Sequence, residues 1–501
     1  MAKLRLDKIT LAMVLASSLT FLLAAMPCCD PKEKIAATHY YVDIDHQNAR
    51  DDEKHGSINK PWRTLEYAFQ QLRPGDTLLV RGGTYENAAI ILTEQNSGRD
   101  GSPITVQAYP NETVVLRNGK PIFFYGAKWW IIDGLHFEQP QGTYIRLGQH
   151  EELGYERTVA AEHIVIRNCE FGNGKYPALP IFYGSEILIE NNYFHHIRPG
   201  RPFSEEGREI SAVVIRYIGD NIVIRNNRFE DIGSDGVHLG SHAYIPGSDI
   251  GTVKITANEF WVNRPYSGIL GNVGENGIDV KKCRGPILIS GNKIHGFRPT
   301  TPQQDASGAN GDGLIVHDNA QNVIIEGNLF YDNTAHLNIA KGAGEGPRDI
   351  IVRNNIFSRS IASDNPGYTV EGSALQVRSA DDVQVHHNTF YDNDWFLLSN
   401  HVSRCVFKNN IVIGGEAKVQ EHNSEWEADY NAWSQITGSV PTALQGEHDV
   451  VAEDLALDQD FRPLPNSPVV GAGQNVGVTN DLAGNPRGAP PDLGALEHIS
   501  N

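Results

Sequence analysis

Cysteine is scarce in this sequence, at 5 of 501 residues. Two of them lie together at Cys28 and Cys29, and the other three, Cys169, Cys283 and Cys405, lie far apart. An odd number of widely separated cysteines excludes a disulfide framework, and no C-x-x-C pair remains that would indicate a metal site. We therefore expect the last three cysteines to be buried free thiols.

Basic residues are also few. The 42 lysines and arginines are outnumbered by 61 aspartates and glutamates, which gives a formal net charge of −19. This balance excludes a broad, non-specific nucleic-acid binder, and no nucleic-acid partner is expected. With 21% charged and 40% hydrophobic residues, the composition also excludes a disordered chain and a membrane bundle.

Long apolar runs are absent apart from one at residues 11–25, which follows Lys3, Arg5 and Lys8. This run is too short for a membrane span and is typical of a signal peptide. We expect residues 1–29 to be a signal peptide, either a plain secretory signal or one of the lipoprotein type, since it ends in the cysteine pair. The predicted location is secreted, periplasmic or at the cell surface, with membrane contact only through a lipid anchor.

Glycine, in contrast, is abundant at 49 residues, and an internal repeat runs through the middle of the chain. Each copy is an alternating apolar strand followed by Asn, one residue and an aromatic or aliphatic residue, as in IVIRNCEF (164–171), ILIENNYF (187–194) and IVIRNNRF (222–229). The copies recur at a base period of 22–23 residues with insertions. A unit of this length that holds short strands is typical of one coil of a parallel β-helix.

The repeated asparagine and the residue two positions later predict two stacks. The asparagines would bond the backbone of the next turn, and the aromatic residues would stack in the core. Cys169 takes the asparagine position in one coil. The predicted asparagine ladder consists of Asn192, Asn227, Asn258, Asn292, Asn328, Asn355, Asn388 and Asn410.

These patterns predict an all-β solenoid in three parts. Residues 1–29 are the signal peptide, residues 38–444 form the parallel β-helix, and residues 445–501, rich in Pro and Gly, form an irregular C-terminal cap. Residues 64–73 have helical spacing of apolar residues, with Thr64 as a capping residue, and would cover the first coil as a helix. We expect a monomer.

A second strand follows each Asn-x-Phe motif, and aligning these strands places outward residues in columns about 4.8 Å apart. The first column consists of Arg216, Gly240, Lys281, His317, Ala340 and Arg378. The second consists of Val214, His238, Asp279, Ile315, Asn338 and Gln376. Ser211, Asp235, Asn276 and Asp312 come just before the strands, with Glu275 nearby. A basic stripe therefore lies beside an acidic cluster.

This arrangement suits β-elimination of an anionic, uronic-acid-containing polysaccharide. Lys281 would take the C5 proton if its pKa is lowered by burial or by neighbouring cations, and His317 or His238 would assist proton transfer. Arg216 and Arg378 would bind carboxylates. Ca²⁺ prefers a group of oxygen ligands, and these would come from four acidic residues. The candidate calcium ligands are Asp235, Glu275, Asp279 and Asp312.

The two ends of the chain resemble secreted right-handed parallel β-helix proteins of the pectate-lyase-like type. The resemblance rests on PWRTLEYA (61–68), GGTY (82–85) and SPITVQAY (102–109), and on NSPVVGAG (466–473) and PDLGALE (491–497) near the C-terminus. It implies the right-handed form of the solenoid. The same fold hosts polysaccharide lyases, glycoside hydrolases, uronate epimerases and non-catalytic surface proteins.

Two polysaccharide lyase families share local motifs with the second strands. Family nine carries an Asp-Asp-Gly-x-Asp coil followed by a lysine base, and here the matching residues are SDGVH (234–238) and then Lys281, so that only Asp235 matches as an acid. The segment ENGIDVK (275–281) is more weakly similar to the alginate and dermatan lyases of family six, although His317 stands where their arginine is expected. Both resemblances imply a lysine base.

Two alternatives remain open. A glycoside hydrolase or uronate epimerase on the same fold would use paired carboxylates, and Asp235 and Asp279 are available for an inverting hydrolase. The Asp-Pro-His-Asp motif of many alginate epimerases is absent. A non-catalytic cell-surface or glycan-binding protein is the third hypothesis, and a flat, uncharged face would favour it.

Overall fold

The computed structural model describes nine stretches of the chain: residues 38–149, 157–198, 210–240, 249–263, 274–298, 311–342, 344–362, 372–420 and 423–499. The predicted signal peptide at 1–29 lies outside them. In this described part, no helix is both long enough and apolar enough to cross a membrane.

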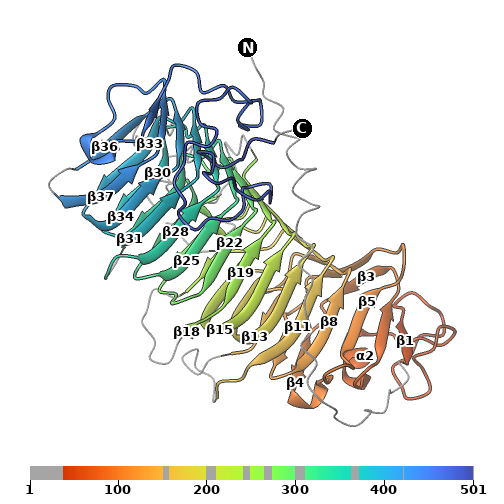
Figure 1. Cartoon of the computed structure of the whole chain (residues 1–501). Helices are drawn as coiled ribbons and strands as arrows, with labels where there is room; N and C mark the ends of the chain where they lie inside the picture. Colours follow the sequence, from red (N-terminus) through yellow and green to blue (C-terminus); the bar gives the residue numbers. More distant parts are fainter. Residues whose placement is uncertain are drawn as a thin grey trace, which may run out of the picture.

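Nearly all regular structure is parallel β-sheet wound into an elongated right-handed solenoid (Figure 1). The predicted all-β, parallel β-helix fold is therefore confirmed. Each coil contributes strands to three faces. The long strands β13 (Leu179–Glu190) and β15 (Val213–Arg225) bend from the first face to the second, so these two faces count as one 25-stranded sheet.

The strands pair coil on coil within each face. The first face consists of β4 (Ile90–Thr93), β7 (Ile122–Tyr125), β10 (Ile145–Leu147), β17 (Asp235–Leu239), β21 (Asn276–Lys281), β24 (Asp312–His317), β27 (Ala335–Ala340), β30 (Ser373–Arg378), β33 (Trp395–Asn400) and β36 (Glu416–Val419). The second face consists of β1 (His39–Val42), β2 (Thr77–Val80), β5 (Ile104–Ala108), β8 (Lys128–Asp133), β11 (Ala161–Arg167), β18 (Asp249–Ile250), β19 (Val253–Thr256), β22 (Ile287–Ser290), β25 (Gln321–Glu326), β28 (Arg348–Arg353), β31 (Asp381–His386), β34 (Val402–Lys408) and β37 (Ser424–Asp429). The third face consists of β3 (Gly83–Glu86), β6 (Val114–Arg117), β9 (His136–Glu138), β12 (Glu170–Gly172), β14 (Tyr193–His195), β16 (Arg228–Glu230), β20 (Glu259–Trp261), β23 (Lys293–His295), β26 (Leu329–Tyr331), β29 (Ile356–Ser358), β32 (Thr389–Tyr391), β35 (Ile411–Ile413), β38 (Ala432–Ser434) and β39 (Val450–Val451).

The asparagine ladder forms as predicted, at the turn between the second and third faces. Each amide oxygen accepts a bond from the backbone N–H of the asparagine one coil earlier, as from Asn292 to Asn328 at 2.9 Å. Each amide nitrogen donates to a strand carbonyl of an earlier coil, as from Asn328 to Ile289 at 2.9 Å. The ladder begins at Cys169, whose N–H donates to Asn192, and it extends one coil beyond the prediction, to Asn431.

The core of the solenoid is a continuous stack of apolar side chains. Phe171, Phe194 and Phe229 lie face to face, with ring centroids 4.8 and 4.9 Å apart. This is the aromatic column that the repeat predicted. The three cysteines of the described part, Cys169, Cys283 and Cys405, are buried free thiols, as expected.

Both ends of the solenoid are covered. The helix α2 (Leu65–Gln71) is capped by the Thr64 side chain, which accepts from the backbone N–H of Tyr67, and it buries Leu65, Ala68 and Phe69 against the first coils. At the other end, Ile436, Val440 and the fully buried Leu444 pack against the core. After β39 the chain folds back along the flank of the solenoid, where Arg487 donates to Asn354 and to Glu497.

One histidine lies inside the solenoid. His336 is fully buried at the start of β27, where it accepts a bond from Asn333 and donates to Asn393. Burial lowers the pKa of His336 to about 3, so the side chain is neutral. Burial likewise lowers the pKa of His386 to about 4, helped by the charges of Lys408 and Arg353.

These histidines predict acid lability. Below about pH 6.5, histidines of the unfolded chain take up protons, whereas His336 and His386 of the folded chain stay neutral. For each proton that the unfolded chain binds in excess of the folded chain, the free energy of unfolding falls by about 1.4 kcal/mol per pH unit of acidification. His387, with a lowered pKa, adds to this effect, and Asp312, with a raised pKa, opposes it. We expect the melting temperature to fall between about pH 6.5 and about pH 4.5, and His386→Gln to reduce the slope. A melting temperature that is constant over this range would contradict the prediction.

Candidate active site

The two outward columns predicted from the sequence are present in the strand register of the first face. Lys281 pairs with His317, and Ala340 pairs with Arg378. In the second column, His238 pairs with Asp279. The basic stripe and the acidic cluster therefore lie side by side on β17, β21 and β24.

A column of glycines explains how polar side chains come to face outward at the start of these strands. A Cβ on Gly236 would lie 2.5 Å from the core ring of Phe260, and one on Gly277 would lie 2.5 Å from the carbonyl oxygen of Gly313. Only glycine fits against the core at these positions. The residues that precede the glycines are thereby turned away from the core and toward the cluster. These residues are Asp235, Asn276 and Asp312.

Asp279 lies at the centre of the cluster and faces three basic side chains. Its Oδ2 lies 2.9 Å from Lys281 Nζ and 3.7 Å from His238 Nδ1, and its Oδ1 lies 3.0 Å from His317 Nε2. Lys281 and His238 are almost completely buried, whereas 15% of the His317 side chain is exposed. His317 also has Nδ1 3.6 Å from Asp318.

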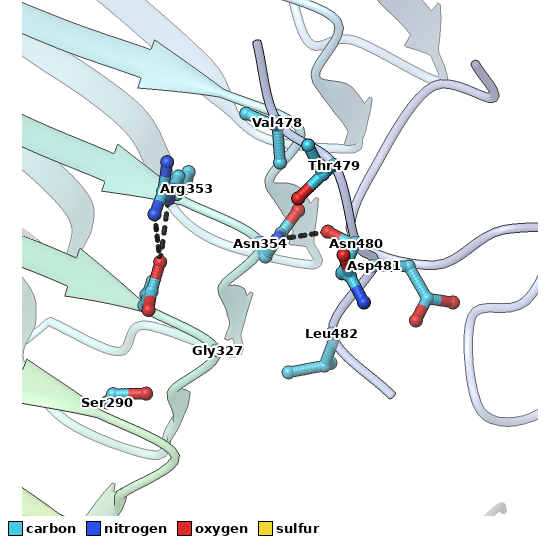
Figure 2. A pocket seen from close by; sticks show the side chains of 10 residues that line it. Ser290, Gly327, Arg353, Asn354, Val478, Thr479, Asn480, Asp481 and Leu482 are labelled. Atoms are coloured by element: carbon cyan, nitrogen blue, oxygen red, sulfur yellow. Dashed lines mark hydrogen bonds and ion pairs between the residues drawn. The ribbon is translucent and has the colours of Figure 1, made fainter. Parts of the chain in front are cut away.

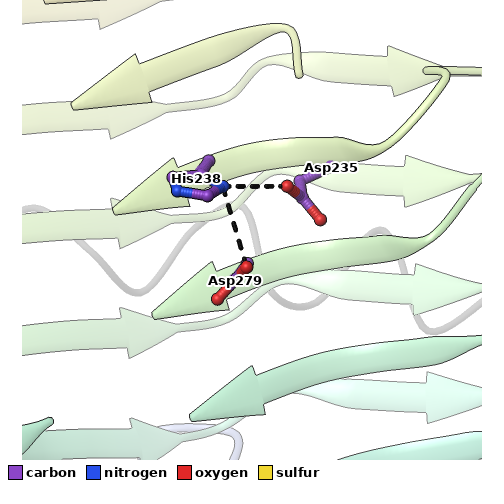
Figure 3. Close-up of side chains that lie close together, drawn as sticks. All are labelled: Asp235, His238 and Asp279. Carbon is purple, nitrogen blue, oxygen red and sulfur yellow. Dashed lines mark hydrogen bonds and ion pairs between the residues drawn. The ribbon is translucent and has the colours of Figure 1, made fainter. Parts of the chain in front are cut away.

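Asp235 accepts hydrogen bonds from three side chains, and Figure 3 shows the one from His238. Its Oδ2 accepts from His238 Nδ1 at 3.0 Å and from Ser211 Oγ at 3.0 Å, and its Oδ1 accepts from Asn276 Nδ2 at 2.8 Å. The side chains of Asp235, His238 and Asp279 converge, with one potential ligand atom from each lying within 4.8 Å of the others.

Two acidic side chains of the cluster, Asp279 and Asp312, have pKa values shifted in opposite directions. Burial alone would raise the pKa of Asp279, but the positive charges of His238, His317 and Lys281 outweigh it and hold the pKa below its usual range. Burial raises the pKa of Asp312 to about 6, although Asn338 donates to its Oδ2 at 3.0 Å. Asp312 Oδ1 is buried without a hydrogen-bond partner in the described structure. Asp279 is therefore ionised at neutral pH, and Asp312 is poised to hold a proton.

The pKa of His317 is shifted in the opposite direction from the pKa values of the buried histidines of the core. Burial would lower its pKa, but the hydrogen bond and the charge of Asp279 outweigh burial and raise it. The imidazole therefore carries a proton more readily than a free histidine does.

The structure does not bring all the predicted site residues together. Lys281, His317, His238, Asp235 and Asp279 share one cluster, and Asp312 adjoins it. The remaining three candidates lie around it: Arg216 on β15 two strands from Lys281, Glu275 just before β21 and partly buried, and Arg378 on β30 three strands away.

Four contacts were not assigned from the sequence. Ser211, Asn276 and Asn338 donate to the aspartates, and Asp318 lies beside His317. The alignment of coils places the first three at the right positions, but it contains no signal that distinguishes a hydrogen-bond donor from a surface residue.

A Ca²⁺ ion takes six to eight oxygen ligands. All four carboxylate oxygens of Asp235 and Asp279 already contact protein donors, and the third convergent group is the nitrogen of His238. The ammonium of Lys281 lies where a cation would have to approach Asp279. This part of the site does not fit Ca²⁺, and calcium stays a prediction of the sequence.

A separate cavity of about 270 Å³ lies between the C-terminal tail and the ends of β25 and β28 (Figure 2). Two of its charged groups are paired with each other, because Arg353 Nε donates to Glu326 at 2.7 Å. Asn354 donates to the carbonyl of Asn480 and fixes the tail in place. This cavity belongs to the docking of the tail and not to the cluster.

Several known proteins are similar to this chain. A lacto-N-biosidase of Bifidobacterium longum is 22% identical over 92% of the chain and 36% of its own length. The chain thus spans about a third of that relative. Among solved structures, the pectate lyase Pel9A is 18% identical with a TM-score of 0.48, covering 93% of this chain and 98% of that one. The family six alginate lyase AlyGC is 17% identical with a TM-score of 0.51, covering 76% and 52%.

The family described as Pel9A-like, right-handed β-helix region, matches residues 40–410. This stretch includes every residue of the cluster and most of the chain. The chain therefore belongs to the Pel9A-like right-handed β-helix family.

Proposed function

We propose that this protein is a carbohydrate-active enzyme that cleaves a uronic-acid-containing polysaccharide by β-elimination. The observation that carries the proposal is the buried carboxylate of Asp279, which contacts Lys281 through one oxygen and His317 through the other. β-Elimination needs a base for the C5 proton, an acid for the leaving oxygen and a positive charge for the substrate carboxylate. The cluster and its border supply a candidate for each.

The charges around Asp279 assign the base and the acid. His317 lies between the carboxylates of Asp279 and Asp318, so its protonated form is the better stabilised. Asp279 also contacts Lys281 at 2.9 Å and lies 3.7 Å from His238, whose Nδ1 donates to Asp235. Burial favours the neutral form of a basic group, and Lys281 is almost completely buried. We assign that neutral form to Lys281, which makes it the base.

Arg216 supplies the positive charge for the substrate. It lies in the same column as Lys281, two strands away, or about 10 Å at 4.8 Å per strand. The position between them is Gly240, which has no side chain to fill the gap, and a Cβ there would lie 1.8 Å from the Lys281 carbonyl oxygen. Among the described residues, no carboxylate lies within 4.0 Å of Arg216. We assign to its guanidinium the binding of a uronate carboxylate.

The proposed reaction is balanced without an external reactant. The substrate carboxylate pairs with Arg216, which makes the C5 proton more acidic. Lys281 Nζ takes that proton, the C–H electrons form the C4–C5 double bond, and the C4–O4 bond breaks. His317 gives its proton to O4. The products are an unsaturated uronate and a new chain end.

A glycoside hydrolase is the second candidate, and one observation favours it. Asp312 has a pKa raised to about 6 while that of Asp279 is lowered, and environments that separate the pKa values of two carboxyls are typical of an acid and base pair. Hydrolysis would leave no double bond in the product and would not need Lys281.

The test is an assay for unsaturated uronate by ultraviolet absorbance. The full chain is incubated with pectate, alginate, glucuronan and glycosaminoglycans, each with added calcium or with a chelator. We expect absorbance to rise with one substrate class and to persist with the chelator. Reducing ends without absorbance would support the hydrolase, and no product with any substrate would contradict both enzymes.

A further inference from the structure

A second hollow lies on the same face as the cluster, further toward the C-terminal end of the solenoid. It has a volume of about 140 Å³ and lies over β30, β33 and β36. Its lining residues are Arg378, Leu398, Ser399, Asn400, Lys418 and Gln420. The strand register shows that Arg378 pairs with Asn400, and Leu398 with Lys418.

Both basic residues of this hollow are exposed, and the charge of Arg378 also acts on Asp312. Within the described stretches, no carboxylate lies within 4.0 Å of Arg378 or Lys418. In a chain of net charge −19, several arginines and lysines of the coils are paired with carboxylates, as Arg353 is with Glu326 and Lys408 with Glu427. An exposed arginine and an exposed lysine beside one hollow, neither within 4.0 Å of a described carboxylate, therefore indicate an anion-binding site.

The rest of the lining indicates a sugar and not a simple inorganic anion. Leu398, which is 7% exposed, provides an apolar surface between the two cations, and Asn400 and Gln420 provide amide groups at the edge. The hydroxyl of Ser399 accepts from Trp426 and keeps its own O–H to donate. A uronic-acid unit matches this set: its carboxylate pairs with the cations, its hydroxyls with the amides and its C–H face with leucine.

The position of the hollow fits a chain that runs along the solenoid. Arg378 lies in the same column as Lys281, three strands along, which is about 14 Å at 4.8 Å per strand. An extended polysaccharide advances by roughly one strand spacing per sugar, so a chain cleaved at Lys281 would reach the hollow a few units away. We propose that Arg378 and Lys418 form a distal subsite for a uronate carboxylate, a role that rests on the proposed function.

The proposal is tested by titration calorimetry with a uronate hexamer and a dimer, in a Lys281→Ala background that prevents cleavage. The dimer and hexamer are prepared from the polymer that gives product in the assay, or from pectate and alginate if none does. We expect the double substitution Arg378→Ala and Lys418→Ala to weaken hexamer binding at least tenfold and to leave dimer binding unchanged. Lys254→Ala, an exposed lysine on the second face, is the matched control and should have no effect.

The subsite would be contradicted if no variant bound the hexamer, or if the hexamer bound equally well with and without the two cations. It would also be contradicted if millimolar inorganic phosphate displaced the hexamer, because this would indicate a general anion site. The titration is independent of turnover. If the chain binds hexamer through the hollow but releases no unsaturated product, the subsite is supported and the lyase function is contradicted. If it releases unsaturated product but binds hexamer equally well without the two cations, the lyase function is supported and the subsite is contradicted.

Discussion

Replacing Lys281 by alanine is expected to reduce the rate of β-elimination by about 100- to 10,000-fold, the usual contribution of a general base. The substitution removes the group that takes the C5 proton and leaves Arg216 in place to bind the substrate carboxylate. The loss should therefore fall mainly on kcat, with little change in KM. The measurement is the initial rate of unsaturated product under saturating substrate.

The variant Lys281→Arg distinguishes a role of Lys281 in proton transfer from a purely electrostatic role. Arginine also contacts Asp279 from this position, but it does not lose its proton in proteins and so has no neutral form to act as a base. We expect it to be as inactive as Lys281→Ala, with the melting temperature close to that of the parent chain. If Lys281→Arg retained most of the activity, Lys281 would be an electrostatic residue, and His317 or His238 would have to be the base. Lys254→Ala, far from the cluster, serves as the control for loss of a lysine.

The repeat is the part of the molecule that the sequence predicts best. Each coil places the same residue types against the same neighbours, so alternation and spacing are enough to align the strands. The eight ladder asparagines and the pairing of Lys281 with His317 follow from this alignment alone. Coil stacking is thus a local rule applied many times, and the register of the outward columns follows from it.

The chemistry of the cluster depends on contacts that the alignment does not specify. The sequence shows Asp279 and Lys281 on one strand, but not that a single carboxylate binds both Lys281 and His317. It predicts Asp235 as an oxygen ligand for calcium, whereas the structure shows both of its oxygens occupied by side-chain donors. It also gives no sign that His336 lies inside the solenoid, because polar residues are normally placed outside. These features follow from side-chain direction and burial.

The asparagine ladder carries the second large prediction: Asn328→Ala should lower the free energy of unfolding by about 3–6 kcal/mol. Asn328 is fully buried, accepts from the N–H of Asn292 and donates to the carbonyl of Ile289. Alanine would leave both backbone groups buried without partners, at about 1–3 kcal/mol each, and would add a cavity. Because folded proteins are stable by only about 5–15 kcal/mol, this is a large fraction of the total.

The loss of stability should depend on where the substituted residue lies in the asparagine ladder. Cys169 begins the ladder, and its side chain makes only weak sulfur contacts with the carbonyls of Arg167 and Ile132. Because these partners are carbonyls, Cys169→Ala would leave no backbone N–H without its hydrogen-bond acceptor. We expect a smaller loss there, and none for Asn466→Ala at an exposed site. Denaturant unfolding of the three variants measures the order. Equal losses at Asn328 and Cys169 would mean that core packing, and not the hydrogen bonds of the ladder, holds the coils in register.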